Sequence, residues 1–435
     1  MDKLFELTPA QLAIAQARRE KKKQVEAFQA NIKATTTTLL QRQWLNVSPP
    51  PKSLTSSVKI LTWNILAQCL VRRTLFPTSD CLKSVQRHPL IQEELIRQDA
   101  QIICLQEVDQ LEKLYPVLEK SGYKAHYASG RAKKHGCLIG YKKELYTFVS
   151  DKTVFYDEQH IGTTPDQGRV GASFKTRNIG YMVAMKSKTN ENEGIIAATT
   201  HLFWHPKYTY ERIRQAAILL REVAAFKESL SASAWPCIVA GDFNFGPADP
   251  GYSLLTGDSL LPSQEDAIKP SMVVHSSIDI TITKNAPPTE EIKEDDEGNA
   301  VDPDRVITGA RVAVDSDGLL STQELIDWFS ALPNLRSVYA DGLQEARELG
   351  NKVARYGDRV AIPDERQGAH EPEYTSYTHH WQAVLDYIFI LEPPQKPVHI
   401  AGLLAPLTEE DMTPGLPQQR VSGSDHICLV AELAW

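Results

Sequence analysis

The sequence predicts a mixed α/β fold for most of the chain, and three observations support this prediction. Short apolar runs typical of buried strands recur from residue 58 to the end of the chain. Stretches with the helical spacing of apolar residues lie between them. The 435 residues, of which 42% are hydrophobic, suffice for a large buried core. Many strands with interspersed helices make an α/β or an α+β domain.

Residues 1–56 are predicted to form a helical, charged extension and a linker. Thr8 and Pro9 have the residue types that begin a helix. A charged stretch follows at 18–23, and the prolines at 49–51 prevent a helix from continuing. The basic residues would suit nuclear import or an RNA contact. We favour a solvated helical extension, because mixed charge runs are usually exposed faces.

Residues 57–435 carry the patterns of strands and helices. The predicted strands are 58–63, 102–105, 137–141, 195–200, 237–240, 384–390 and 427–431. Helical periodicity is found at 90–98, 111–119 and 210–229. These elements are interspersed, so we expect them to belong to one domain.

An acidic insertion at about 285–330 interrupts this domain. Residues 285–304 carry eight acids against one lysine, which is typical of an exposed, mobile segment. The acids and the glycine of 313–324 have the spacing of a calcium-binding loop. Ala313 stands at the first ligand position and cannot coordinate through its side chain, so we do not expect Ca²⁺ here. The interpretation we favour is an Asp-Gly turn followed by a capped helix.

The composition argues against several classes of protein. No apolar run approaches the roughly 20 residues that span a bilayer. The N-terminus lacks the apolar core of a secretory signal. It also contains acids, which are scarce in transit peptides. The six cysteines form no C-x-x-C pair, and most lie in apolar runs, as in a reduced intracellular protein. A formal net charge of −8 argues against a protein that coats nucleic acid by bulk charge. We expect a cytoplasmic or nuclear protein with no membrane partner.

Six short segments place acids, amides and histidines in or just past predicted strands, where open α/β sheets usually build their sites. They are Trp63-Asn64, Leu105-Gln106-Glu107, Thr200-His201-Leu202, Gly241-Asp242-Phe243-Asn244, Leu385-Asp386-Tyr387 and Ser424-Asp425-His426. Each alone is weak evidence, because an acid after a strand is more often a helix cap. The set supplies carboxylates for a hard cation, amides to hold an oxygen and histidines to face developing charge. It therefore predicts metal-dependent chemistry on phosphate.

The order of these segments resembles the endonuclease/exonuclease/phosphatase superfamily over residues 57–435, apart from the insertion. Within it the chain is most similar to the RNA exonucleases of the carbon-catabolite-repressor deadenylase family, which includes nocturnin and the Ngl and Angel groups. The phrases that carry the resemblance are 62–67, 103–109, 241–244 and 424–427. The resemblance implies a nuclease domain built as a four-layer α-β-β-α sandwich, with two packed mixed sheets flanked by helices. No leucine-rich repeat precedes it, so the partner-binding module of the deadenylases is missing and the fungal Ngl-type enzymes are the more similar.

The resemblance assigns three residues to a metal ion. Glu107 would ligate Mg²⁺, with Mn²⁺ as the alternative cation, and the amide of Asn64 would assist. Asp425 would lie on the metal side of the site. These residue types agree with the preference of Mg²⁺ for oxygen ligands.

The resemblance assigns five further residues to the chemistry. Asp242 would orient or deprotonate the attacking water, and Asn244 would hold the phosphate. His426 would face the scissile phosphate while Asp386 fixes its ring, since an aspartate on one ring nitrogen sets the tautomer. His201 would be a second histidine in contact with the phosphate.

Two positions in the resemblance concern the nucleobase. Pro206 would pack on a base, and its neighbour His205 is included among the substrate-binding candidates. Trp381 lies five residues before Asp386, where the family has an aromatic residue. An indole that stacks on an unpaired base contributes about 1–3 kcal/mol. The alternative for Trp381 is an ordinary core tryptophan.

A basic stretch at 131–135 concerns the phosphate backbone. Lys134 and its basic neighbours would track RNA, with a solvated loop as the alternative. His135 stands where the deadenylases usually have the acid of an Asp-Gly-Cys phrase. We therefore do not expect strict poly(A) specificity.

These features predict a magnesium-dependent 3′–5′ exoribonuclease that acts on the 3′ end of single-stranded RNA, in poly(A) removal or 3′-end processing. We expect a monomer. One alternative is a phosphatase acting on a nucleotide or dinucleotide phosphate ester, and another is an inactive RNA-binding protein. An abasic-site DNA endonuclease is disfavoured, because Asp109 stands where that branch normally has a lysine.

Overall fold

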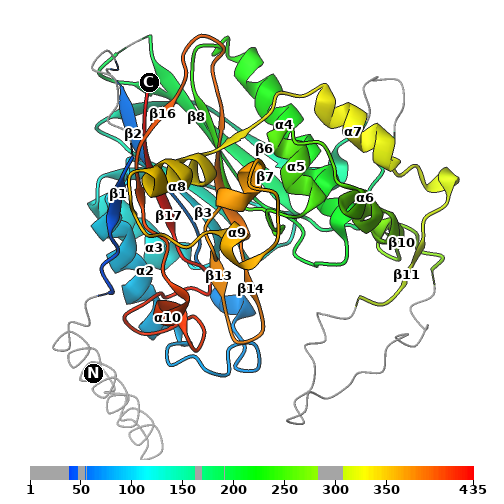
Figure 1. Ribbon diagram of the computed structural model, residues 1–435, viewed down its shortest axis with the longest axis horizontal. Coiled ribbons are helices and arrows are strands. Elements are labelled where there is room, and N and C mark those ends of the chain that lie inside the picture. Colours follow the sequence, from blue (N-terminus) through cyan, green and yellow to red (C-terminus); the bar gives the residue numbers. More distant parts are fainter. Residues whose placement is uncertain (1–38, 48–53, 55, 162–168, 191, 283–306) are drawn as a thin grey trace, which may run out of the picture. The chain divides into compact units, whose positions relative to one another are not determined.

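Two β-sheets form the centre of the fold in the computed structural model, which describes residues 39–47, 54, 56–161, 169–190, 192–282 and 307–435 (Figure 1). The first sheet has the strand order β1-β16-β17-β2-β3-β5-β4. Its strands are β1 (Trp44–Asn46), β2 (Ser57–Asn64), β3 (Ile102–Val108), β4 (Tyr123–Ser129), β5 (Gly136–Lys142), β16 (His399–Leu404) and β17 (Leu429–Ala434). Among the described strands of this sheet, only β2 and β3 pair in parallel, and helix α2 (Ser84–Gln98) connects them.

The second sheet has the order β12-β15-β9-β8-β7-β6. Its strands are β6 (Tyr146–Phe155), β7 (Ile179–Ser187), β8 (Gly194–His201), β9 (Cys237–Asp242), β12 (Arg336–Ser337) and β15 (Asp386–Leu391). Here β8 and β9 form the parallel pair, joined by helix α4 (Thr209–Ser229). Each sheet is therefore mixed, with one parallel pair among antiparallel strands.

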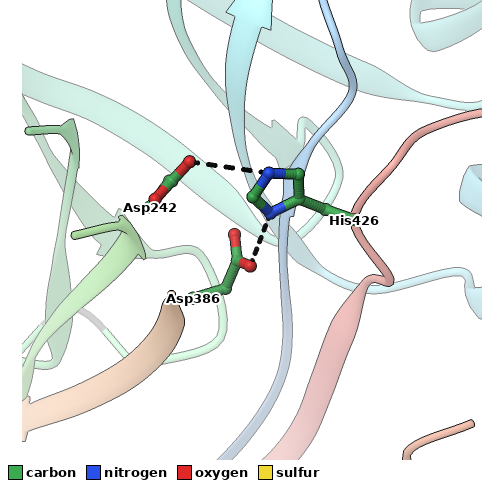
Figure 2. Close-up of side chains that lie close together, drawn as sticks. All are labelled: Asp242, Asp386 and His426. Atoms are coloured by element: carbon green, nitrogen blue, oxygen red, sulfur yellow. Dashed lines mark hydrogen bonds and ion pairs between the residues drawn. The ribbon is translucent and has the colours of Figure 1, made fainter. Parts of the chain in front are cut away.

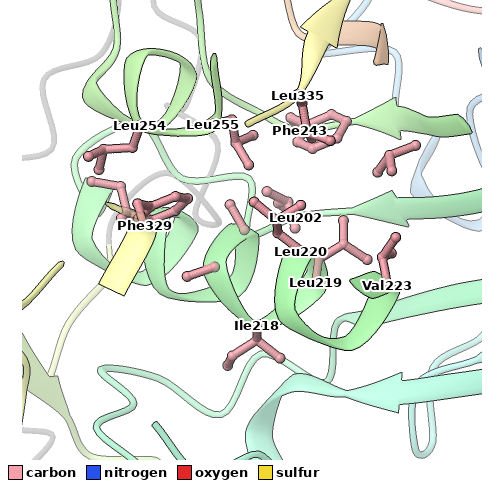
Figure 3. Packing of buried hydrophobic residues seen from close by; sticks show 14 of the residues in the cluster. Leu202, Ile218, Leu219, Leu220, Val223, Phe243, Leu254, Leu255, Phe329 and Leu335 are labelled. Carbon is pink, nitrogen blue, oxygen red and sulfur yellow. The ribbon is translucent and has the colours of Figure 1, made fainter. Parts of the chain in front are cut away.

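Three layers of buried apolar side chains hold the sheets and helices together. Between the sheets, Ile60 of β2 belongs to the same cluster as Ile238 of β9. On the outer face of the first sheet, the helices α2 and α3 (Leu111–Lys120) pack through residues such as Leu95. The outer face of the second sheet packs against α4, α5 (Pro250–Thr256) and α7 (Thr322–Ser330) (Figure 3). This arrangement confirms the predicted α-β-β-α sandwich.

The remaining helices are α6 (Pro262–Ile268), α8 (Val338–Glu348), α9 (Tyr356–Arg359) and α10 (Glu409–Met412). Two further antiparallel strand pairs, β10 (Val273–His275) with β11 (Ala310–Val312) and β13 (Ser376–Tyr377) with β14 (Gln382–Ala383), and several 3₁₀ turns complete the described elements. No helix in the described ranges has both the length and the apolar character needed to cross a bilayer.

All seven strands predicted from the sequence are present, although the last one begins at Leu429 instead of residue 427. Strand β1 lies inside the stretch predicted as a linker and pairs with β16. Helix α7 lies inside the predicted insertion, yet its side chains Leu325 and Phe329 belong to the core beside α4. The predicted N-terminal helix and the acidic segment 285–304 lie outside the described residues.

The loop with calcium-like spacing, 313–324, is held by protein partners. Both carboxylate oxygens of Asp317 accept hydrogen bonds from Arg311, at 2.6 and 2.7 Å. Ser321 caps helix α7 by accepting from the main chain of Glu324, whose carboxylate accepts in return from the main chain of Ser321. The structure therefore has the Asp-Gly turn and capped helix that we favoured.

Candidate active site

The carboxyl ends of both parallel strand pairs meet at one edge of the sandwich. Asn64 ends β2 and Glu107 lies next to the end of β3, while His201 and Asp242 end β8 and β9. The two sheets face each other, so these four side chains converge although they are far apart in the sequence. The antiparallel strands β15 and β17 bring Asp386 and the 424–427 segment to the same edge.

Asn64 joins carboxylates from both sheets. Its Nδ2 donates to Oε1 of Glu107 at 3.1 Å and to Oδ2 of Asp242 at 2.9 Å. Its Oδ1 accepts from the main-chain nitrogen of Leu66 at 3.0 Å. One buried amide thereby fixes two acids that the sequence assigned to different roles.

The side chain of Glu107 is aimed by an irregularity in β3. The register between β3 and β5 shifts here, and Glu107 has a φ of +57°, which a residue with a side chain rarely adopts. The second carboxylate oxygen of Glu107 accepts from the main chain of Ala67 at 2.8 Å. Burial alone would raise the pKa of Glu107, but His201, His135 and these hydrogen bonds bring it below its ordinary value. Glu107 is therefore a carboxylate at neutral pH.

Asp242 and Asn244 form the turn that follows β9. Oδ1 of Asp242 accepts from the main-chain nitrogen of Asn244 at 3.0 Å. Asn244 adopts a φ of +53°, and its Nδ2 donates to the carbonyl of Leu202 at 3.0 Å. Burial and the neighbouring Asp386 raise the pKa of Asp242 to about 7.

His426 lies between two aspartates (Figure 2). Its Nδ1 donates to Oδ2 of Asp386 at 2.7 Å, and its Nε2 lies 3.8 Å from Oδ2 of Asp242. Trp63 Nε1 donates to the carbonyl of His426 at 2.9 Å and holds its main chain. Burial would lower the pKa of His426, but Asp386 and Asp425 raise it well above the ordinary value. The ring is therefore held as an imidazolium.

His201 has the opposite character. Its Nδ1 lies 3.8 Å from Oε1 of Glu107 and its Nε2 lies 3.6 Å from Oδ2 of Asp242. Burial lowers the pKa of His201, and the negative charge of Glu107 raises it. The effect of burial is the larger one, and the pKa of His201 is about 3. The site thus presents one neutral and one charged imidazole to its interior.

Asp425 completes the acids of the site, and buried Arg87 holds the loops beside it. Burial raises the pKa of Asp425. Arg87 of α2 donates to the carbonyls of Ile65, Leu66 and Gly423, at 2.6, 2.5 and 2.7 Å. The loop after β2 and the loop before β17 are therefore tied to one side chain.

The residues present fit a divalent cation of the Mg²⁺ type. Four carboxylates and two amides lie close together in this buried site. Burial and repulsion between the carboxylates make their negative charges unfavourable, and the raised pKa of Asp242 reflects this. Such a cluster favours a hard cation with oxygen ligands. Ligand atoms of Asp242, Asp386 and His426 lie within 4.8 Å of one another. Nδ1 of His426 already donates to Asp386, however, so this trio suits an acid–imidazole pair better than a metal site.

The substrate-binding candidates are placed unequally. His205 is only 4% exposed, and its Nδ1 accepts from the main chain of Lys207 at 3.2 Å, whereas Pro206 is exposed. Trp381 is half-buried and packs edge-on against Phe76, with ring centroids 5.8 Å apart. Its Nε1 donates to the hydroxyl of Ser376 at 3.1 Å, and the ring packs against the small apolar cluster that contains Phe76.

A pocket beside Glu107 and His201 is lined by Lys133 and His135 of the basic stretch 131–135. It also contains Arg177 and Asn178, which the sequence analysis did not single out. Lys134, the candidate chosen from the sequence, is exposed and does not line this pocket. A polar Arg-Asn pair directly before the apolar run 179–185 was the signal that could have identified the others.

Comparison with known proteins agrees with this arrangement. The model of the Endonuclease/Exonuclease/phosphatase family matches residues 61–426. The probable RNA exonuclease C9B6.11c of Schizosaccharomyces pombe is 30% identical over 398 residues, which cover 86% of this chain and 76% of that protein. The RNA exonuclease NGL2 of Saccharomyces cerevisiae is 27% identical over 422 residues, which cover 86% of this chain and 78% of that protein.

Solved structures share the fold. A crystal structure of ANGEL2, described as a 2′,3′-cyclic phosphatase, covers 91% of this chain and 99% of its own, with 22% identity and a TM-score of 0.57. The alignment with the human nocturnin catalytic domain covers 90% of this chain and 97% of that domain, with 19% identity and a TM-score of 0.51. The match of the family model over most of the chain, on a sandwich that brings the expected residues together, shows that this chain belongs to the Endonuclease/Exonuclease/phosphatase family.

Proposed function

We propose that this chain is a magnesium-dependent exoribonuclease that shortens single-stranded RNA from its 3′ end. One observation carries the proposal: acids, amides and histidines from six separate segments converge in one buried site. The members of this set that contact one another directly are Asn64, Glu107, His201, Asp242, Asn244, Asp386 and His426. Relatives that span most of the chain are named RNA exonucleases, which supports RNA as the substrate.

Glu107 would hold the divalent cation, with Asn64 and Asp425 beside it. When bound, Mg²⁺ or Mn²⁺ would offset the charge of the phosphate and of the departing sugar oxygen. Because Asn64 also binds Asp242, the acid nearest the water is fixed relative to the metal ligand.

Asp242 would orient the attacking water and accept its proton. Both oxygens of its carboxylate are held by neighbours, which directs the group into the site. His426 would donate from Nε2 to a phosphate oxygen, with Asp386 holding the opposite nitrogen. His201 and the amide of Asn244 would contact the same phosphate group. In-line displacement by water needs groups on both sides of the phosphorus, and the roles assigned here would supply them.

Incubation with Mg²⁺ and 5′-labelled single-stranded RNA tests the proposal. A ladder of progressively shortened 5′-labelled products supports a 3′–5′ exoribonuclease. Free phosphate released from a nucleotide ester without RNA decay would instead indicate a phosphatase, and retention of intact RNA would indicate a binding protein. Asp242→Ala should lose hydrolysis, and turnover near the parent rate would contradict its role.

The active unit is proposed to be a monomer of the nuclease domain, residues 57–435, with residues 1–56 as an extension. Light scattering of the active protein would measure its mass. We also propose a cytoplasmic or nuclear location, because the relatives that span most of the chain are named RNA exonucleases.

A further inference from the structure

The pocket beside Glu107 and His201 is formed where loops from the two sheets meet. Residues 130–135 connect β4 and β5 of the first sheet, and residues 177–178 lead into β7 of the second. The pocket shares Glu107 and His201 with the candidate active site, whereas Asp242 and His426 do not line it. It therefore lies on one flank of the site and not at its centre.

Both loops are fixed closely against each other. A Cβ atom on Gly130 would lie 1.8 Å from the carbonyl oxygen of Arg177, so only glycine permits this approach. Asp157 accepts from the main-chain nitrogens of Thr176 and Arg177, at 3.1 and 2.8 Å. The main chain of Lys133 donates to Gly130 at 3.0 Å. The pocket is thus a built feature and not a gap between loose loops.

The polar groups of the pocket favour an anion. Lys133 is half-buried, and its ammonium donates to Oδ1 of Asn178 at 3.1 Å. Within the described part of the chain, neither Lys133 nor Arg177 has a carboxylate at ion-pair distance. His135 adds an imidazole, with its ring centroid 6.3 Å from that of His201.

Glu107 is the one acid among the lining residues. It is also the residue to which we assign the divalent cation, which would offset its negative charge. A half-buried ammonium without a carboxylate partner retains donors that charged oxygens would satisfy, and phosphate oxygens form strong hydrogen bonds with such cations.

We infer that this pocket binds a second phosphate group of the substrate, adjacent to the one that is hydrolysed. The inference rests on the proposed function, because it takes the scissile phosphate to lie between His201 and His426. The second phosphate has two sources: the next phosphate along the RNA backbone or a phosphate on the RNA terminus. Lys133 and Arg177 are then specificity-determining residues, because they contact the substrate away from the reacting bond.

The test compares Lys133→Gln with Lys120→Gln, a control at an exposed lysine that ends helix α3 and does not line the pocket. Kinetics are measured on an oligoribonucleotide and on a dinucleoside monophosphate, which has no second phosphate. We expect Lys133→Gln to raise KM for the oligonucleotide about tenfold, as for loss of one hydrogen bond to a charged group, without changing kcat. Turnover of the dinucleotide should be unaffected, Lys133→Arg should restore most of the affinity for the oligonucleotide, and Lys120→Gln should resemble the parent. Equal losses on both substrates, or no loss on either, would overturn the inference.

The terminus of the oligonucleotide identifies the source of the second phosphate. A penalty that appears only with RNA ending in a 3′-phosphate assigns the pocket to a terminal phosphate. A penalty that appears equally with a 3′-hydroxyl end assigns it to the backbone.

A binding experiment separates this inference from the proposed function. If the parent protein does not hydrolyse RNA, the proposed function fails, and fluorescence anisotropy with labelled RNA in EDTA still tests the pocket. Loss of one phosphate contact should reduce the slope of log affinity against log salt by about 0.7 for single-stranded RNA. An unchanged slope in Lys133→Gln, with unaltered thermal unfolding, would then count against the pocket.

Discussion

His426 donates to Asp386 at 2.7 Å, and this hydrogen bond crosses from the segment before β17 in the first sheet to β15 in the second. Asp386 favours the doubly protonated ring, so Nε2 of His426 also carries a proton, which faces Asp242. The packing of the two sheets against each other therefore also determines the protonation of the His426 ring.

Asp386→Asn should lower kcat by about 10² to 10⁴-fold, the range of a general acid–base contribution, with little change in KM. The amide no longer stabilises an imidazolium, although it fills the same volume. Steady-state kinetics on labelled RNA measure the effect. The control is Asp364→Asn, an exposed aspartate that pairs with Arg355 and should leave both constants unchanged. A kcat near that of the parent in Asp386→Asn would contradict the assignment.

Glu107→Gln should weaken Mg²⁺ binding by more than about tenfold. Loss of a residue that only supports a metal ligand already lowers metal affinity by about ten- to a hundredfold, and Glu107 is proposed as a direct ligand. Isothermal titration with Mg²⁺ measures the affinity directly and does not depend on turnover. Glu112→Gln removes an exposed carboxylate five residues away and serves as the matched control. Equal affinities in the two variants would exclude Glu107 as a ligand.

Arg87→Met should lower the free energy of unfolding by about 3 kcal/mol, because three buried carbonyls lose their donor. Turnover should also fall, since the loop that follows Asn64 and the loop that carries Asp425 lose their common anchor. Urea denaturation and initial rates measure the two effects. Arg73→Met is the control: Arg73 is exposed and donates to one carbonyl, that of Ser79. It should change stability by no more than about 0.5 kcal/mol.

Trp381→Ala should raise KM for RNA by an amount that corresponds to about 1–3 kcal/mol of lost base stacking. Its ring is half-buried at the border of a small apolar cluster, so we expect a smaller effect on stability than on KM. Trp381→Phe should recover much of the affinity. A large fall in the melting temperature with an unchanged KM would favour a core role instead.

Glu371 should make the stability of the fold depend on pH. It is fully buried, and its Oε1 accepts from the hydroxyls of Tyr252 and Ser337, while its Oε2 has no partner among the described residues. Burial raises its pKa from an ordinary value of 4.5 to about 7. The folded state therefore binds this proton more tightly than the unfolded state does, so stability from this group falls as pH rises from about 4.5 through 7.

Urea denaturation of the parent and of Glu371→Gln at pH 5 and pH 8 measures this effect. Relative to the variant, the parent should lose up to about 3 kcal/mol over that interval. Taking the difference between the two proteins removes the contribution of the other groups that titrate. A difference that stays constant with pH would show that Glu371 does not titrate in this range.

The central residues of the site could be predicted because their positions follow from strand direction. Asn64, Glu107, His201 and Asp242 stand at the ends of apolar runs, and parallel strands bring such ends together. The same argument predicted most of the first sheet. It does not identify β6, whose mostly exposed or half-buried residues form no apolar run.

The pocket residues could not be assigned in this way. Lys133 and Lys134 are equivalent in sequence, and which one turns inward depends on how the loop packs against Arg177. Arg177 and Asn178 reach the site only because β7 lies next to β8. Side chains on loops are placed by contacts that are distant in the sequence, and no local pattern encodes them.

Strand β17 is the final strand of the chain and yet lies between β16 and β2, inside the first sheet. A stop codon just after His426 would leave every assigned catalytic side chain encoded, but it would delete this strand. The gap would separate β16 and β1 from the rest of the sheet and open the apolar layer that contains Leu429 and Leu433. Late nonsense alleles should therefore behave as complete loss of the protein, degraded before its chemistry could be observed.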